Sequence, residues 1–169
     1  MNSNRIPFLL TNGVSLSIIY GEVMRVVESI KLVPIESNKI TIITGIIYSD
    51  ETLKNIFSLE NLVSRQLNSV YAFKILYKDC VCGFINMIYN ERENYIEVDV
   101  GIKENYRNKG IGSTALKMLK TFCINNMAFS DMEIIAQVQK QNIAGIKVLE
   151  NNGFSKKIEN KDYKYYKIK

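Results

Sequence analysis

The sequence of 169 residues contains no histidine, and this absence removes several kinds of chemistry. Without an imidazole there is no Ser-His-Asp or Cys-His nucleophile system, no imidazole proton shuttle and no zinc site built from histidine. Any general acid or base in this chain must therefore be a carboxylate, a tyrosine, a cysteine or a lysine.

Cysteine is also scarce, and the three thiols belong to Cys80, Cys82 and Cys123. One C-x-C pair with a single distant partner lacks the paired spacing of a zinc or iron–sulfur site. We interpret the thiols as structural and expect no metal. The low cysteine content favours a reducing cytoplasm over secretion.

Long apolar runs are absent as well. The longest uncharged stretch, residues 6–21, is interrupted by Pro7, by a Thr-Asn-Gly turn and by two serines, so it falls short of the ~20 apolar residues of a membrane span. It does not resemble a secretory signal with a small-residue cleavage site either. We therefore expect no membrane partner.

What is present is typical of one globular domain: 47% hydrophobic and 23% charged residues, with no repeat or flexible linker. The net charge of +5 is unevenly placed, because residues 101–120 and 155–169 each carry +4. The first basic cluster favours a local anion site. The second, with Tyr163, Tyr165 and Tyr166 among its lysines, is the only segment with the pattern of a nucleic-acid-binding surface.

The spacing of apolar residues predicts a chain of mixed helices and strands. Helices are predicted around Ile40 to Ile47 and over residues 51–66, 113–127 and 142–151, with Gly153 as a left-handed stop. Strands are predicted over residues 31–35, 70–77, 81–89, 95–102 and 132–138, followed by a hairpin of residues 154–158 and 163–168. The three strands between residues 70 and 102 are interpreted as an antiparallel meander.

The most informative segment is the short basic loop that joins the strand ending at Ile102 to the next helix. A strand, a glycine-containing loop and a helix N-terminus direct several backbone N–H groups at one point, where a phosphate is held well. Gly110 and Gly112 remove side chains that would keep an anion from those amides. The loop lacks both the Gly-Lys-Ser/Thr of a P-loop and the third glycine of the dinucleotide fingerprint.

Two blocks of this chain resemble the GNAT superfamily of N-acetyltransferases. Arg107-x-x-Gly110-x-Gly112 resembles the acetyl-CoA loop of that superfamily, and residues 142–154 resemble its later Asn-x-x-Ala helix that ends in Gly-Phe. The resemblance covers residues 81–154 and extends back to Lys31, where Tyr48-Ser49-Asp50-Glu51 is similar to the branch that acetylates ribosomal-protein N-termini.

The resemblance implies an α+β fold with a central, mostly antiparallel mixed sheet of about six to seven strands and about four flanking helices. It assigns residues 30–169 to the acetyltransferase domain. Residues 1–29 fall outside the resemblance, and we expect them to be an N-terminal extension packed on that domain, as an extra hairpin, a lid or a contact in a homodimer.

The resemblance also implies acetyl-CoA as the co-substrate and marks the residues that would bind it. Backbone groups of one strand end would pair with the pantetheine amides, as a peptide adds to a sheet edge. A loop would hold the pyrophosphate, and Asn142 would bond the pantetheine arm while also capping its helix. The strand end comprises Val100, Gly101 and Ile102; the loop comprises Arg107, Asn108, Lys109, Gly110, Ile111, Gly112 and Ser113; Ala144 and Lys147 lie near the cofactor path.

For catalysis, Glu97 stands where the superfamily often carries its general base, and Asp99 projects from the same strand face. Two such carboxylates, if partly buried, would raise the pKa of one of them toward neutrality. Many relatives place a tyrosine, which protonates the leaving thiolate, where this chain has Leu149. The general acid is therefore unassigned.

The resemblance thus predicts an enzyme that transfers an acetyl group from acetyl-CoA to a primary amine of a small molecule or a protein N-terminus, by direct attack on the thioester. Two alternatives stay open. A non-catalytic acyl-CoA-binding module would bind the cofactor without turnover. A nucleic-acid-binding protein would use the lysine and tyrosine tail, with an affinity for oligonucleotides that falls steeply with salt and no binding of CoA, and is the least favoured alternative.

Overall fold

The computed structural model describes residues 29–57, 69–90 and 92–168. Its elements follow one another as β1 (Ile30–Pro34), α2 (Lys39–Tyr48), α3 (Glu51–Ile56), β2 (Ser69–Tyr77), β3 (Cys80–Asn90), β4 (Tyr95–Ile102), the 3-10 turn η1 (Glu104–Tyr106), α5 (Ile111–Asn125), β5 (Glu133–Gln139), α6 (Ile143–Asn151), β6 (Ser155–Glu159) and β7 (Tyr163–Ile168). No helix of this described part is long and apolar enough to cross a membrane. The predicted extension of residues 1–29 lies outside the described residues except for Ser29.

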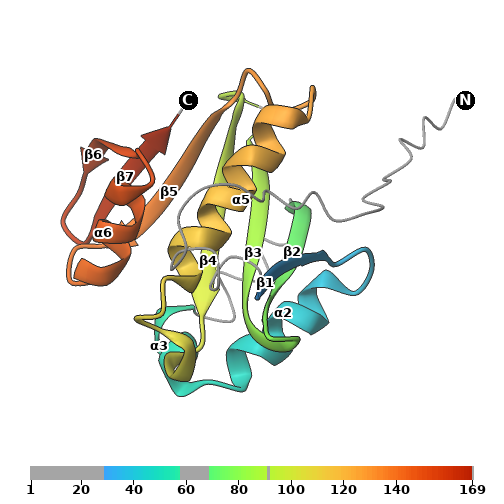
Figure 1. The fold of residues 1–169 in the computed structure, drawn as a ribbon. Coiled ribbons are helices and arrows are strands. Elements are labelled where there is room, and N and C mark those ends of the chain that lie inside the picture. The colour runs from blue at the N-terminus through green and yellow to red at the C-terminus, as the bar shows by residue number, and fades with distance from the viewer. Residues whose placement is uncertain (1–28, 58–68, 91, 169) are drawn as a thin grey trace, which may run out of the picture.

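The seven strands form one sheet in the order β1-β2-β3-β4-β5-β7-β6 (Figure 1). Only β4 and β5 run parallel, and every other neighbouring pair is antiparallel. The described residues also form four α-helices. The predicted α+β class, the antiparallel meander and the C-terminal hairpin are therefore confirmed.

Two buried clusters hold the helices against opposite faces of the sheet. On one face α5 and α6 pack through residues such as Leu119 and Leu149 against Ile96 and Val98 of β4. On the other face α2 and α3 pack against β2 and β3 around Phe84. Since side chains alternate along a strand, the residues of β4 between Ile96 and Gly101 divide strictly between these two faces.

One predicted helix is shorter than expected. The periodicity of residues 51–66 predicts one continuous helix, but α3 ends at Ile56 and Phe57 has extended backbone, with φ −113° and ψ 104°. By leaving the helix, the Phe57 ring reaches Phe84 at a centroid distance of 5.2 Å in an edge-on contact. Packing of Phe57 against the buried Phe84 ring outweighs the local helix preference. Residues 58–66 of the predicted helix lie outside the described part.

The β4–β5 pair separates partway along its length. The parallel register runs from Tyr95 opposite Glu133 to Val98 opposite Ala136, whereas β4 continues to Ile102. Beyond Ala136, β5 stays paired with β7 on its other side. The last residues of β4 therefore present a strand edge to an opening in the middle of the sheet, between two strands that are both fully described.

Candidate active site

The end of β4 supplies backbone groups to the opening. Val100, Gly101 and Ile102 pair with β3 on one side and lie past the last β4–β5 pair on the other. Such an edge can accept the amides of an extended ligand. The Lys103 amide bonds to Cys82 on β3, so by the alternation of an antiparallel ladder the backbone groups of Gly101 also face β3, whereas those of Val100 and Ile102 face the opening. The carbonyl of Ile102 already accepts a 2.9 Å hydrogen bond from Nε of Arg107, so Val100 and the Ile102 amide offer the accessible part of the edge.

Gly101 has a structural reason to be glycine that the sequence did not indicate. A Cβ at this position would lie 2.4 Å from Cε1 of Phe84, whose side chain is fully buried in the cluster with α2 and α3. Packing of the sheet alone therefore explains the residue type here, whether or not a ligand approaches its backbone.

The loop from Lys103 to Gly110 is held by its own hydrogen bonds. The Lys103 amide donates to the Cys82 carbonyl at 2.9 Å, which fixes the loop to β3. The Lys109 ammonium donates to the Asn105 carbonyl at 2.9 Å and lies over the Tyr106 ring. Asn108, with φ 59°, makes a left-handed turn that asparagine tolerates. The charges of Arg107 and Lys109 thus stand on an ordered loop.

The N-terminus of α5 follows directly and is open to a ligand. Gly110 has φ 73° and caps the helix without a side-chain hydrogen bond. The first bond of the helix runs from the Thr114 amide to the Gly110 carbonyl, so the amides of residues 111–113 precede it. These N–H groups, together with the helix dipole, favour an anion. The sequence predicts that this helix begins at Ser113, whereas α5 begins two residues earlier, at Ile111.

The two glycines of the loop differ in what they do. A Cβ on Gly110 would meet no atom within 4 Å, but its positive φ is one that side chains rarely adopt. Gly112 has ordinary helical backbone, and a Cβ there would meet only Cγ1 of Ile102 at 3.5 Å, a normal contact. The protein therefore has room for a methyl group at position 112, and the bare surface there is available to a ligand.

Asn142 caps α6, as the sequence predicted. Its Oδ1 accepts a 2.9 Å hydrogen bond from the Gly145 amide. A Cβ on Gly145 would lie 2.8 Å from Nδ2 of Asn142, so glycine at this position leaves space for the cap. Ala144 and Lys147 are exposed on the outer face of α6, opposite the buried Ile146.

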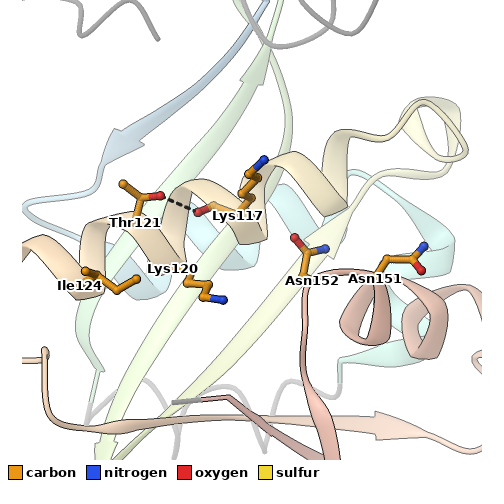
Figure 2. A pocket seen from close by; sticks show the side chains of 6 residues that line it. All are labelled: Lys117, Lys120, Thr121, Ile124, Asn151 and Asn152. Atoms are coloured by element: carbon orange, nitrogen blue, oxygen red, sulfur yellow. Dashed lines mark hydrogen bonds between the residues drawn. The ribbon is translucent and has the colours of Figure 1, made fainter. Parts of the chain in front are cut away.

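The ends of α5 and α6 meet through Asn152, which sequence reasoning had not singled out. Its Nδ2 donates to Oγ of Ser113 and to the Val148 carbonyl, both at 2.8 Å. Beside this contact lies a pocket of about 320 Å³ with no acidic residue in its wall, lined by Lys117, Lys120, Thr121, Ile124, Asn151 and Asn152 (Figure 2). Its α5 residues lie three or four positions apart, and this spacing in the sequence could have indicated that they share one face of the helix.

This pocket is separate from the opening in the sheet, since no residue of β4 or β5 lines it. It extends the positively charged surface that begins at the N-terminus of α5. Figure 2 shows the side chains of Lys117 and Lys120 extending from that helix in different directions.

The two candidate carboxylates lie on the sheet face opposite α5. Glu97 stands opposite Ile88 on β3 and Ile135 on β5, within the paired part of the strand. Asp99, roughly 6.6 Å further along β4, is the first residue past the separation and stands opposite the buried Asn86. Both side chains are partly exposed. The structure thus places Asp99 where the opening begins and Glu97 just before it, in the paired part of β4.

Leu149 is buried in the cluster between α6 and the sheet, with 8% of its surface exposed. The position that would carry a tyrosine in many relatives therefore contributes packing. The nearby phenol of Tyr166 donates a 2.8 Å hydrogen bond to Glu150. Burial, aided by that carboxylate, raises the pKa of Tyr166 above its ordinary value.

The lysine and tyrosine tail does not form one basic surface. Tyr166 is 2% exposed and belongs to the core. Several tail lysines are paired with carboxylates: Lys157 and Lys167 with Glu133, and Lys156 with Glu159. The aromatic and cationic pattern in the sequence is therefore divided between the core and local ion pairs, which weighs against a nucleic-acid surface.

The cysteines are free thiols. Cys82 and Cys123 are buried, and burial raises the pKa of each thiol to about 11, which keeps both protonated near neutral pH. Cys80 is exposed at the start of β3. The buried pair fits a packing role.

Comparisons with known proteins identify the family of this chain and other proteins with its fold. A family model described as an acetyltransferase (GNAT) domain matches residues 38–155. No curated protein matches the sequence. Among solved structures, the ribosomal L7/L12 alpha-N-protein acetyltransferase RimL in complex with coenzyme A has a TM-score of 0.63 at 12% identity, over 83% of this chain and 93% of that chain.

Two further structures show the same fold. The N-acetyltransferase PseH of Campylobacter jejuni in complex with acetyl coenzyme A has a TM-score of 0.57 at 20% identity, over 83% of this chain and 98% of that one. A dodecameric spermidine N-acetyltransferase from Vibrio cholerae has a TM-score of 0.61 at 15% identity, over 83% and 94%.

Proposed function

Because the chain belongs to the GNAT family of acetyltransferases, which transfer an acetyl group from acetyl-CoA to an amine, we propose that it binds acetyl-CoA in the opening between β4 and β5. The observation that carries this proposal is the separation of these strands after Val98 and Ala136. It exposes a strand edge that leads without interruption into the basic loop and the open N-terminus of α5.

Each part of acetyl-CoA then has a matching group. The pantetheine amides pair with the backbone of Val100 and with the Ile102 amide, which face the opening. The pyrophosphate lies at the amides of residues 111–113, where the helix dipole and the charge of Arg107 favour it. Nδ2 of Asn142 is available to donate to a pantetheine carbonyl, because the cap of α6 uses only Oδ1 of that side chain.

The chemistry joins the acceptor nitrogen to the acetyl carbon. The lone pair of the neutral amine attacks the thioester carbonyl, a C–N bond forms, and the C–S bond then breaks to release the CoA thiolate. Binding both reactants in one opening supplies proximity, and an amide of the β4 edge faces the developing oxyanion.

Two protons must move in this reaction. We assign the proton of the attacking amine to Glu97, with Asp99 orienting the cationic acceptor where the opening begins. The thiolate takes its proton from water, since Leu149 has no hydroxyl group and is buried.

The acceptor is proposed as a cationic amine, because the two carboxylates of β4 lie on the face from which it approaches. Protein N-termini, polyamines and amino sugars, including aminoglycosides, share that chemistry. RimL and the spermidine enzyme show that one fold serves both a protein and a small-molecule acceptor.

The test is a panel of these amines with acetyl-CoA, in which released thiol is measured. We expect thiol release that depends on one class of amine. Binding of acetyl-CoA without thiol release for any amine would favour the non-catalytic module. Absence of acetyl-CoA binding at millimolar concentration would contradict the proposal.

A further inference from the structure

Asp50 connects two distant parts of the chain through a single carboxylate. It precedes α3, and its Oδ1 accepts a 3.0 Å hydrogen bond from the Leu53 amide, as a helix N-cap does. Its Oδ2 accepts a 2.7 Å hydrogen bond from the amide of Glu104, which lies 54 residues later in the loop after β4. Only the second bond reaches beyond the local helix.

A second contact runs parallel to the first. Oγ1 of Thr52, in the first turn of α3, donates a 2.8 Å hydrogen bond to Oε2 of Glu104. Both the backbone and the side chain of Glu104 are therefore held by α3. Figure 1 shows α3 beside the turn that follows β4, so these bonds bring together the helices of one sheet face and the loop that leads to α5 on the other.

Electrostatics strengthen this contact. Burial would raise the pKa of Asp50, but hydrogen bonds from the Glu104 and Leu53 amides and the nearby charge of Arg107 more than offset it, so the pKa lies below its usual value. The carboxylate is thus ionised throughout the neutral range, and its bonds to the two amides are charge-assisted.

The bonded turn leads directly into the anion-binding part of the loop. The Arg107 amide donates to the Glu104 carbonyl at 3.0 Å, and Nε of Arg107 donates to the Ile102 carbonyl. Only Asn108 and Lys109 separate Arg107 from the glycine that caps α5. The position of Glu104 is thus passed on, through this hydrogen bond and the short segment that follows, to Arg107 and the first amides of α5.

We propose that Asp50 is a positioning residue for acetyl-CoA, which holds the loop of residues 103–110 in the geometry that receives the pyrophosphate. The inference rests on the proposed cofactor site. If the loop is in this geometry for only a fraction of the time, the apparent dissociation constant rises by the inverse of that fraction, whereas turnover at saturation is unchanged.

The substitution that separates this role from helix capping is Asp50→Ser. Serine is a good N-cap, so it keeps the bond to the Leu53 amide, but its single short hydroxyl cannot also reach Glu104. Thr52→Val removes the parallel bond and leaves Asp50 in place. Asp131→Asn is the matched control, because Asp131 is an exposed carboxylate just before β5, whose first residues pair with the end of β4 that is remote from the loop.

The dissociation constant and the KM for acetyl-CoA are measured for the wild-type protein and each variant, together with kcat at saturating acetyl-CoA. We expect Asp50→Ser to raise both constants roughly tenfold, the effect of one charge-assisted hydrogen bond, with kcat nearly unchanged. Thr52→Val is expected to raise them severalfold, and Asp131→Asn to leave them unchanged. Exchange of the Glu104 amide hydrogen is expected to be faster in Asp50→Ser than in the wild type.

Unchanged acetyl-CoA constants in Asp50→Ser would overturn the inference, as would a loss confined to kcat or to the KM of the amine. If Asp50→Ser does not fold, Thr52→Val decides, and unchanged constants in that variant overturn it. These results differ from failure of the proposed function, in which the wild-type protein itself does not bind acetyl-CoA.

Discussion

Asn152 at the end of α6 donates a 2.8 Å hydrogen bond to the hydroxyl of Ser113 in the first turn of α5. The same amide group donates to the Val148 carbonyl, so the side chain closes α6 and attaches it to α5 at once. Because the Ser113 oxygen accepts this bond, its own hydrogen is left to donate to an acceptor such as a phosphate oxygen. The contact therefore links packing of the two helices to the cofactor loop.

Asn152→Ala removes both of these hydrogen bonds. We expect the free energy of unfolding to fall by about 1–2 kcal/mol and the KM for acetyl-CoA to rise severalfold, because Ser113 is no longer oriented. The neighbouring Asn151→Ala is the control, since Asn151 is exposed and lines the same pocket. Denaturant unfolding and acetyl-CoA titration measure the two effects; equal behaviour of both variants would contradict this role for Asn152.

Gly112→Ala and Gly45→Ala form a matched pair, because both glycines are helical and neither would bring a new Cβ closer than 3.5 Å to another part of the protein. Each change is expected to leave the free energy of unfolding equal or higher by about 0.5–1 kcal/mol, as alanine favours helix. Only Gly112→Ala is expected to weaken acetyl-CoA binding, by roughly tenfold, where the pyrophosphate approaches the backbone. Thermal unfolding with and without acetyl-CoA measures both quantities.

An unchanged acetyl-CoA shift in Gly112→Ala would remove this residue from the binding site. A loss of stability in Gly112→Ala, but not in Gly45→Ala, would instead show that the first turn of α5 requires glycine for the fold.

Glu97→Gln keeps the size of the side chain and removes its ability to accept a proton. If Glu97 is the general base, turnover near neutral pH is expected to fall by roughly 10²–10⁴ while acetyl-CoA affinity hardly changes. The deficit should shrink as the pH approaches the pKa of the acceptor amine, because more of that amine is already neutral. Asp99→Asn is expected to act mainly on the KM of the amine.

The measurement is a pH-rate profile of the wild type and both variants on the amine that the panel identifies. Full activity of Glu97→Gln across the range would make Glu97 structural. Collapse of turnover in Asp99→Asn instead would exchange the two roles.

Acid should remove the stabilisation that Asp50 provides. Its folded-state pKa lies below the unfolded value of 3.8, so the ionised form contributes stability above that value, and the contribution is lost as the pH falls through the folded-state pKa. The stability difference between the wild type and Asp50→Asn should therefore be constant from about pH 8 to pH 5 and shrink below about pH 4. Urea unfolding across this range tests it, and a difference that grows toward acid would contradict the assigned direction.

Local sequence was sufficient for most elements and for the cofactor loop. The alternation of β3 and β4, the apolar stripe of α5 and the left-handed glycines after β4 and after α6 depend on neighbours within a few residues, so they can be predicted without a partner. The two segments that resemble the GNAT superfamily, residues 107–112 and 142–154, lie in or beside these elements. The fold and the binding of acetyl-CoA could therefore be predicted from the sequence.

Tertiary structure decided what depends on residues far apart in the chain. Phe57 leaves its helix because Phe84 offers a buried ring, and Gly101 is bare because that same ring fills its space. The bond between Asp50 and Glu104, and the separation of β4 from β5, likewise join segments that no periodicity relates. The free energies of burial and of strand pairing depend on contacts across the whole fold. The local pattern around a residue therefore predicts the helix or strand in which it lies. The residues that it contacts, and with them the shape of the site, are determined only by the packing of the whole molecule.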